Sequence, residues 1–121
     1  MLWNIDFRDK RPIYEQIVSG VEEEILRGIL PPDEPLPSVR SLAMELSVNP
    51  NTIQKAYRQL ETDGYTYSVP GRGSFVSNVE GLRSVKKKEA LQKISGIVHE
   101  AKILGASDGE INEAVKGGMN L

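Results

Sequence analysis

Four of the seven prolines fall within residues 31–37, and this cluster limits how the chain can fold. A helix cannot continue through such a segment, because proline has no backbone N–H and its ring clashes with the preceding helical turn. Residues 31–37 are therefore predicted to form a stiff connector. The helical patterns on its two sides belong to separate elements.

The segment before the connector has the pattern of one amphipathic helix. Pro12 suits its first turn, where a missing N–H is no loss, and Gly28 marks its end. Apolar residues recur between them at three- and four-residue spacing: Ile13, Tyr14, Ile17, Val18, Val21, Ile25 and Leu26. Residues 2–9 alternate between apolar and polar side chains, which predicts a short strand or an extended arm.

Two shorter helices follow the connector, with a tight break at residues 47–49. Ser38 suits the N-cap of the second helix. Asn49 and Pro50 suit the start of the third helix, and Asp63-Gly64 suits its end. The inner faces are Val39, Leu42, Ala43 and Leu46 in the second helix, and Ile53, Ala56, Tyr57 and Leu60 in the third.

A hairpin with a glycine-rich tip comes next. Residues 65–69 and 74–76 are β-prone and flank Pro70-Gly71-Arg72-Gly73. The order of helix, short helix, tight turn, helix and hairpin is that of a winged helix-turn-helix. We therefore expect a mainly α fold with a small β-hairpin wing, in a DNA-binding domain of residues 1–78.

Residues 79–121 are predicted to form a two-helix dimerisation tail. Gly81 and the run of lysines at 86–88 are expected to precede its first helix, which ends at Gly105. Ser107 and Glu110 form a capping box for a final helix that closes at Gly117-Gly118. The first tail helix carries an apolar stripe near a/d spacing: Leu91, Ile94, Val98 and Ala101. This stripe pairs two copies of the chain or packs against the first helix of its own chain.

The exposed side of the third helix carries groups that recognise DNA: Asn51, Thr52, Gln54, Lys55 and Arg58. Amides and guanidinium groups pair with base edges in the major groove. Lys55 or Arg58 could equally hold a phosphate, which fixes register without reading sequence.

Three further features predict phosphate contacts. The tip Gly71-Arg72-Gly73 places one cation where the backbone can approach DNA closely. Arg40 lies one turn into the second helix. The helix N-termini at Ser38 and Asn49 offer backbone N–H donors.

The charge and composition narrow the classes of function. The net charge is −2, and residues 35–76 carry four basic against three acidic side chains, so DNA binding must rest on a few placed contacts. There is no cysteine, and the only histidine, His99, has no catalytic partner in the pattern. We expect no enzyme activity, no metal and no cofactor, and a cytoplasmic protein without a membrane segment. The rival is a winged helix that binds protein, which the polar third helix and the glycine tip disfavour.

Several linked motifs resemble the N-terminal domain of GntR-family bacterial regulators. They are residues 36–43 (LPSVRSLA), 48–57 (VNPNTIQKAY), Leu60-Glu61, Gly64 and 71–76 (GRGSFV), while residues 12–17 (PIYEQI) and the short tail resemble the YtrA-type subfamily. The resemblance implies a sequence-specific transcriptional regulator, expected to be a repressor, that binds double-stranded DNA at an inverted repeat as a homodimer. It also implies that Arg40, the third helix and the tip touch DNA.

The resemblance has two limits that bear on the site. Many relatives carry arginines early in the third helix, where Pro50 and Gln54 stand here, which gives Asn51 and Lys55 more weight as DNA contacts. The tail of about 40 residues is too short to enclose a metabolite. The sequence therefore assigns no small-molecule effector, although YtrA-type relatives are linked to the control of transporter operons.

Overall fold

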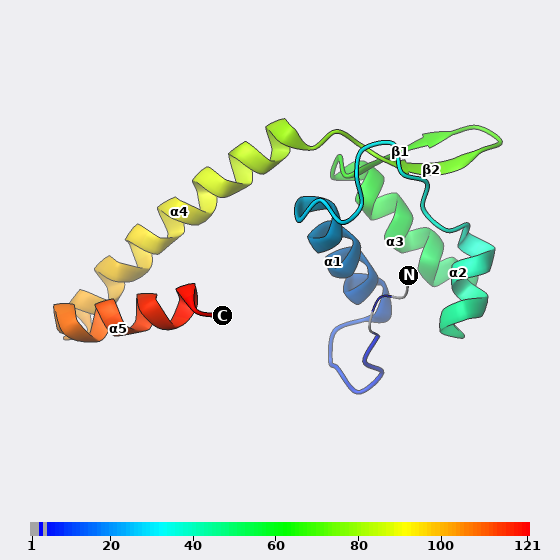
Figure 1. The fold of residues 1–121 in the computed structure, drawn as a ribbon. Helices are drawn as coiled ribbons and strands as arrows, with labels where there is room; N and C mark the ends of the chain where they lie inside the picture. Colours follow the sequence, from blue (N-terminus) through cyan, green and yellow to red (C-terminus); the bar gives the residue numbers. More distant parts are fainter. Residues whose placement is uncertain (1–2, 4) are drawn as a thin grey trace. The chain divides into compact units, whose positions relative to one another are not determined.

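The computed structural model describes Trp3 and residues 5–121 (Figure 1). The chain divides into two compact units, Met1–Leu82 and Arg83–Leu121. The elements in chain order are α1 (Ile13–Leu26), α2 (Val39–Leu46), α3 (Pro50–Thr62), β1 (Thr66–Val69), β2 (Gly73–Val76), α4 (Glu80–Ile103) and α5 (Asp108–Met119). This order confirms the predicted winged helix-turn-helix with a helical tail.

The core of the first unit lies where α1 and α2 pack on α3 and where β1 follows α3. The apolar faces predicted from the helical spacing line it. Its largest fully buried side chains are Tyr65, Ile17, Ile25, Leu42, Ile53, Leu60, Val21 and Val76. Burial of each such aliphatic side chain contributes about 1.5–3 kcal/mol. The core therefore fixes which side of α3 remains exposed.

Alternation predicted a short strand or an extended arm over residues 2–9; no strand forms among the described ones, and the chain turns at residues 6–9. Asp9 N–H donates to the Asp6 carbonyl at 3.2 Å, and residues 1, 2 and 4 lie outside the description. The buried Gln16 explains the difference. Its Oε1 accepts the Asp6 N–H at 2.8 Å, and its Nε2 donates to the Asp6 carbonyl at 2.9 Å. The arm therefore satisfies its backbone without a partner strand.

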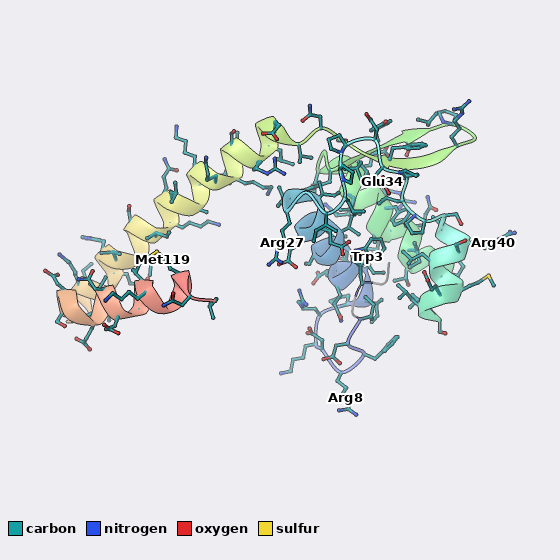
Figure 2. All side chains as sticks on the ribbon, in the orientation of Figure 1. Trp3, Arg8, Arg27, Glu34, Arg40 and Met119 are labelled. Carbon is teal, nitrogen blue, oxygen red and sulfur yellow. The ribbon has the colours of Figure 1, made fainter. Side chains whose placement is uncertain are left out.

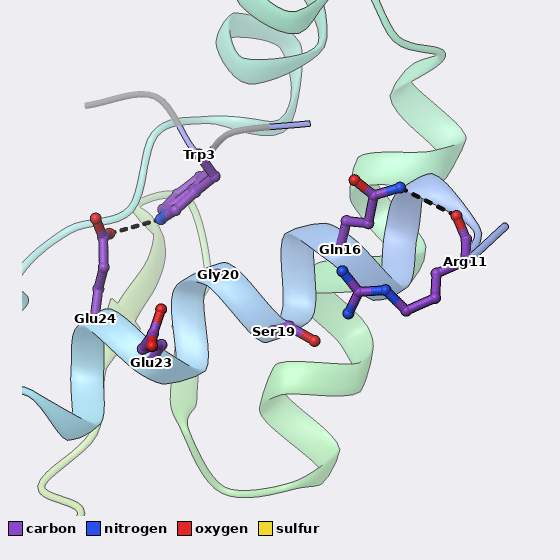
Figure 3. A pocket seen from close by; sticks show the side chains of 7 residues that line it. All are labelled: Trp3, Arg11, Gln16, Ser19, Gly20, Glu23 and Glu24. Atoms are coloured by element: carbon purple, nitrogen blue, oxygen red, sulfur yellow. Dashed lines mark hydrogen bonds between the residues drawn. The ribbon is translucent and has the colours of Figure 1, made fainter. Parts of the chain in front are cut away.

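Trp3 anchors this arm to α1 (Figure 3). The indole Nε1–H donates to Glu24 Oε2 at 2.6 Å. Gly20 lies beneath the ring, and a Cβ atom at this position would stand 3.1 Å from Trp3 Cδ1. The missing side chain at Gly20 thus lets the indole lie close to the helix.

The proline connector also pairs with the wing, which the sequence analysis did not predict. Leu36 N–H donates to the Ser74 carbonyl, and Val76 N–H donates to the Glu34 carbonyl, each at 2.9 Å. An isolated antiparallel bridge joins Pro35 to Phe75. Proline is tolerated here because the segment is an edge, where an N–H can be absent. The connector thereby supports β2 along its length.

The chain reversals between the helices follow the predicted residues. Gly28 and Gly64 adopt positive φ angles of 80° and 85° after α1 and α3, in the left-handed region that favours glycine. The break between α2 and α3 is closed by Ser47 with φ 55°, and Val48 N–H donates to the Ala43 carbonyl at 2.9 Å. The turn of the helix-turn-helix is thus formed without a glycine.

The tail differs from the prediction at two helix ends. Helix α4 begins at Glu80, before the lysine run, because Asn78 Oδ1 accepts the Glu80 N–H at 3.2 Å. Helix α5 continues through Gly117 and Gly118 to Met119, so the predicted end at these glycines is wrong. Each glycine costs a helix about 1 kcal/mol but ends it only with a left-handed backbone, and neither has positive φ here.

The predicted end of α4 and start of α5 are confirmed. Gly105 has φ 93°, its N–H donates to the Lys102 carbonyl at 3.0 Å, and Ala106 N–H donates to the Ala101 carbonyl at 2.9 Å. Ser107 and Glu110 form the reciprocal capping box. The backbone N–H of Ser107 holds the pKa of the Glu110 carboxyl below its usual value.

Candidate nucleic-acid interface

The start of α2 presents Arg40 to solvent (Figure 2). Ser38 caps the helix, since its hydroxyl accepts the Ser41 N–H at 3.0 Å. One residue earlier, the Pro37 carbonyl accepts the Tyr57 hydroxyl of α3 at 2.7 Å. Burial raises the pKa of Tyr57, so the phenol stays protonated and remains a donor. Tyr57 therefore ties the entrance of α2 to α3.

The start of α3 is fixed by its own cap. Asn49 Oδ1 accepts the Asn51 N–H at 2.8 Å, and Pro50 occupies the first turn. The side-chain oxygens of Asn49 and Ser38 are thus used within the fold. The predicted phosphate contacts of Ser38 and Asn49 would therefore be made by backbone N–H groups at the helix N-termini, and not by these side-chain oxygens.

The exposed face of α3 carries the predicted polar residues. Asn51, Gln54, Lys55 and Arg58 are exposed, and Thr52 is half-buried. Gln54 and Arg58 line a cleft of about 120 Å³ with Ser68 and Ser74 of the hairpin, beside Val39, Tyr57 and Glu61. This part of α3 therefore adjoins the wing.

Lys55 takes the opposite flank of α3. Its Nζ lies 4.0 Å from the centroid of the Tyr14 ring on α1. Helices α1 and α3 pack together, and a second groove beside this contact is lined by Arg11, Tyr14, Glu15, Val18, Ser19 and Gln59. The structure thus brings Gln54 and Arg58 beside the wing and directs Lys55 toward α1.

The wing tip is a tight turn with an exposed arginine. Arg72 N–H donates to the Val69 carbonyl at 2.9 Å, and Gly71 and Gly73 have φ angles of 76° and 103°. Proline followed by glycine with positive φ is the pattern of a type II turn. The predicted Gly71-Arg72-Gly73 tip is therefore a defined turn, and both glycines occupy positions that an L side chain rarely adopts.

Three contacts that were not predicted from the sequence hold the wing in place. Glu61 Oε1 on α3 accepts the Ser68 N–H of β1 at 3.0 Å. Tyr67 stacks on Phe75 with ring centroids 5.7 Å apart, and its hydroxyl donates to Asp33 Oδ1 at 2.6 Å. The cross-strand spacing of the two aromatic residues was the one sequence signal for the second contact.

The second unit has an apolar groove between its two helices. Ile94, Ile97, Val98 and Ala101 of α4 line it with Ile111, Ala114 and Val115 of α5, and its volume is about 250 Å³. Leu91 and Ile94 remain 57% and 51% exposed. Three of the four stripe residues therefore line this groove, and Leu91 does not.

Neither a metal centre nor a membrane-spanning helix is found in the described part of the chain. No group of three or more His, Asp or Glu side chains is placed there to hold a metal ion. Within the same residues, no helix combines the length and apolar composition that a membrane crossing requires.

Comparison with known proteins identifies what this arrangement is similar to. Residues 13–76 match the family described as bacterial regulatory proteins, gntR family. The HTH-type transcriptional repressor YtrA of Bacillus subtilis (strain 168) is 43% identical over 96 residues, which cover 74% of each chain. A GntR family transcriptional regulator from Listeria monocytogenes is similar with a TM-score of 0.73 and 36% identity, over 92% of this chain and 98% of that one.

A second similar structure contains DNA. The AraR DNA-binding domain in complex with operator ORE1 is 30% identical, with a TM-score of 0.54, and covers 64% of this chain and 94% of that chain. The complex shows that a domain of this fold binds operator DNA.

Proposed function

This chain belongs to the gntR family of bacterial regulatory proteins, and we propose that it is a repressor that binds an inverted-repeat operator as a homodimer. The observation that carries this proposal is the exposed polar face of α3, which stands between the start of α2 and the wing. Relatives that are named repressors, such as YtrA, support repression rather than activation. Binding to the bacterial chromosome would place the protein in the cytoplasm.

The homodimer is supported by the tail. Leu91, Ile94 and Ile97 on α4 are more than half exposed, which is unfavourable for a stripe of large apolar side chains in water. A two-fold axis would bury the stripe and present two copies of α3 to major-groove segments about 34 Å apart, or a multiple of it. Two half-sites related by the same two-fold axis form an inverted repeat.

The experiment that tests DNA binding is a titration with duplexes at several salt concentrations. Affinity should fall steeply as salt rises, because cations on the protein displace counterions from phosphate. A duplex selected from a random library by the protein itself supplies the operator. Binding to a protein partner that salt does not weaken, with no binding to any duplex, would favour the rival interaction module.

The first prediction concerns base reading by α3. Gln54→Ala should weaken binding to the selected duplex by about 1–3 kcal/mol and relax the base preference at one position, because an amide pairs bidentately with a base edge. Asn51→Ala should relax the preference at a neighbouring position. Repeat selection with each variant measures both effects. An unchanged preference in the double variant would contradict base reading by this helix.

The second prediction concerns the wing. Arg72→Ala should weaken binding to selected and scrambled duplexes alike, and should reduce the slope of log affinity against log salt by about 0.9, the value for one phosphate contact. Arg72→Lys is the matched control and should retain the slope, since it keeps the charge. If Arg72→Ala retains the slope as well, the tip does not contact DNA.

A further inference from the structure

The two polar flanks of α3 face different neighbours. Gln54 and Arg58 adjoin the wing, whereas Lys55 lies over Tyr14 on α1. Consecutive residues on a helix are separated by about 100° of rotation, which places residues 54 and 55 on different sides of the exposed face. Asn51, about one turn before both, stands between the flanks.

A contact with Tyr14 on α1 restrains the side chain of Lys55. Its ammonium lies 4.0 Å from the centroid of the Tyr14 ring, and Tyr14 is half-buried against the core. A cation over an aromatic face is attracted by the ring quadrupole, so the long lysine side chain is restrained in one direction. The ring carries no negative charge, so the three N–H donors stay available to a second, anionic partner.

Arg11 is a weaker candidate for an anion contact on this side. It lines the groove beside Tyr14, but its guanidinium pairs with Asp9 Oδ2 at 3.3 Å. The Tyr14 hydroxyl donates to Glu15 Oε1 at 3.4 Å. Lys55 is therefore the group on this flank best placed to meet a phosphate.

The dimensions of DNA explain why both flanks matter. An α-helix with its side chains is about 10–12 Å wide, and the major groove is about 12 Å wide, so a helix in the groove has a phosphate backbone on each side. The wing would meet one of these backbones. The α1 flank would meet the other, and an ammonium suits phosphate as a compact point charge.

We propose that Lys55, positioned by the ring of Tyr14, binds a phosphate on the DNA strand opposite to the one that the wing contacts. This assignment rests on the proposed function and decides between the two roles that the sequence left open for Lys55. It makes Tyr14 a positioning residue for DNA binding, in addition to its place beside the core.

The test uses the full chain with Lys55→Gln, Tyr14→Leu and Tyr14→Phe, on a duplex that the unchanged protein selects and on a scrambled duplex. Lys55→Gln should weaken both duplexes by the same factor and reduce the salt slope by about 0.9. Tyr14→Leu should weaken binding about two- to fivefold, the size of an exposed cation–π contact, and Tyr14→Phe should not. The Tyr14→Leu/Lys55→Gln double variant should bind no more weakly than Lys55→Gln alone.

Each alternative result has a distinct meaning. A changed base preference with an unchanged slope in Lys55→Gln would show that Lys55 reads a base, which overturns the assignment alone. Losses that multiply in the double variant would overturn the role of Tyr14. If the unchanged protein binds neither duplex, the proposed function fails and the assignment fails with it.

Discussion

A variant with Ile94→Lys and Val98→Lys is expected to sediment as a folded monomer at micromolar concentration. The two side chains lie on α4 and line the apolar groove of the second unit. A lysine ammonium cannot be buried there without a partner, because removal of a charge from water is costly. Two copies would then no longer pair through this stripe.

The loss of pairing should have the largest effect on DNA binding of the changes considered. When two DNA-binding units are linked, the second binds as if at high local concentration, which strengthens the whole by about 10²- to 10⁴-fold. The affinity of the monomer for an inverted repeat should therefore be about 10²- to 10⁴-fold lower than that of the unchanged protein, and cooperativity should be lost. Its affinity for a half-site should stay unchanged. Sedimentation velocity and titration of full-site and half-site duplexes measure the two effects.

A matched variant separates pairing from added charge. Gln92→Lys with His99→Lys also adds two lysines to α4, but at exposed polar positions away from the stripe. This control should remain a dimer and bind the inverted repeat cooperatively. If Ile94→Lys/Val98→Lys also remains a dimer, the interface lies elsewhere and the stripe packs within its own chain.

The sequence predicted those elements whose formation depends on local chemistry. The spacing of apolar residues gave α1, α2 and α3, and the residues Gly28, Gly64 and Gly105 marked ends that the structure confirms. In the first unit, local rules failed where a distant contact decides the outcome. The arm around Asp6 is a turn because the buried Gln16 satisfies its backbone. The connector pairs with β2 because the wing folds back beside it.

In the candidate site too, features that depend on local sequence could be predicted, and features that depend on distant packing could not. The apolar residues that α3 buries determine which side of the helix is exposed. Asn51, Gln54 and Arg58 could therefore be predicted from the sequence as exposed candidates for DNA contact. The sequence could not show that Lys55 and Gln54 face different neighbours, because this depends on how α1 and the wing pack around α3. The roles of these residues on DNA remain predictions that the variants above test.

The second large effect is expected at Ile53, which is fully buried on α3 and directly precedes Gln54. Ile53→Ala should lower the free energy of unfolding by about 2–5 kcal/mol, and Ile53→Val by about 0.5–1.5 kcal/mol, because the larger deletion leaves a larger cavity. Trp3 is the only tryptophan and is buried against α1 in the same unit as α3. Urea unfolding followed by its fluorescence therefore reports this unit.

Ile53 and Gln54 are adjacent, and comparison of Ile53→Ala with Gln54→Ala distinguishes an effect on stability from an effect on DNA recognition. Gln54→Ala should leave the unfolding transition unchanged and relax base preference, since its side chain is exposed. Ile53→Ala should move the transition to lower urea, and at low temperature the fraction that remains folded should keep the base preference of the unchanged protein. A change of preference in Ile53→Ala without loss of stability would mean that Ile53 acts on recognition and not on the stability of the scaffold. A loss below about 1 kcal/mol would show that Ile53 is not packed as its burial indicates.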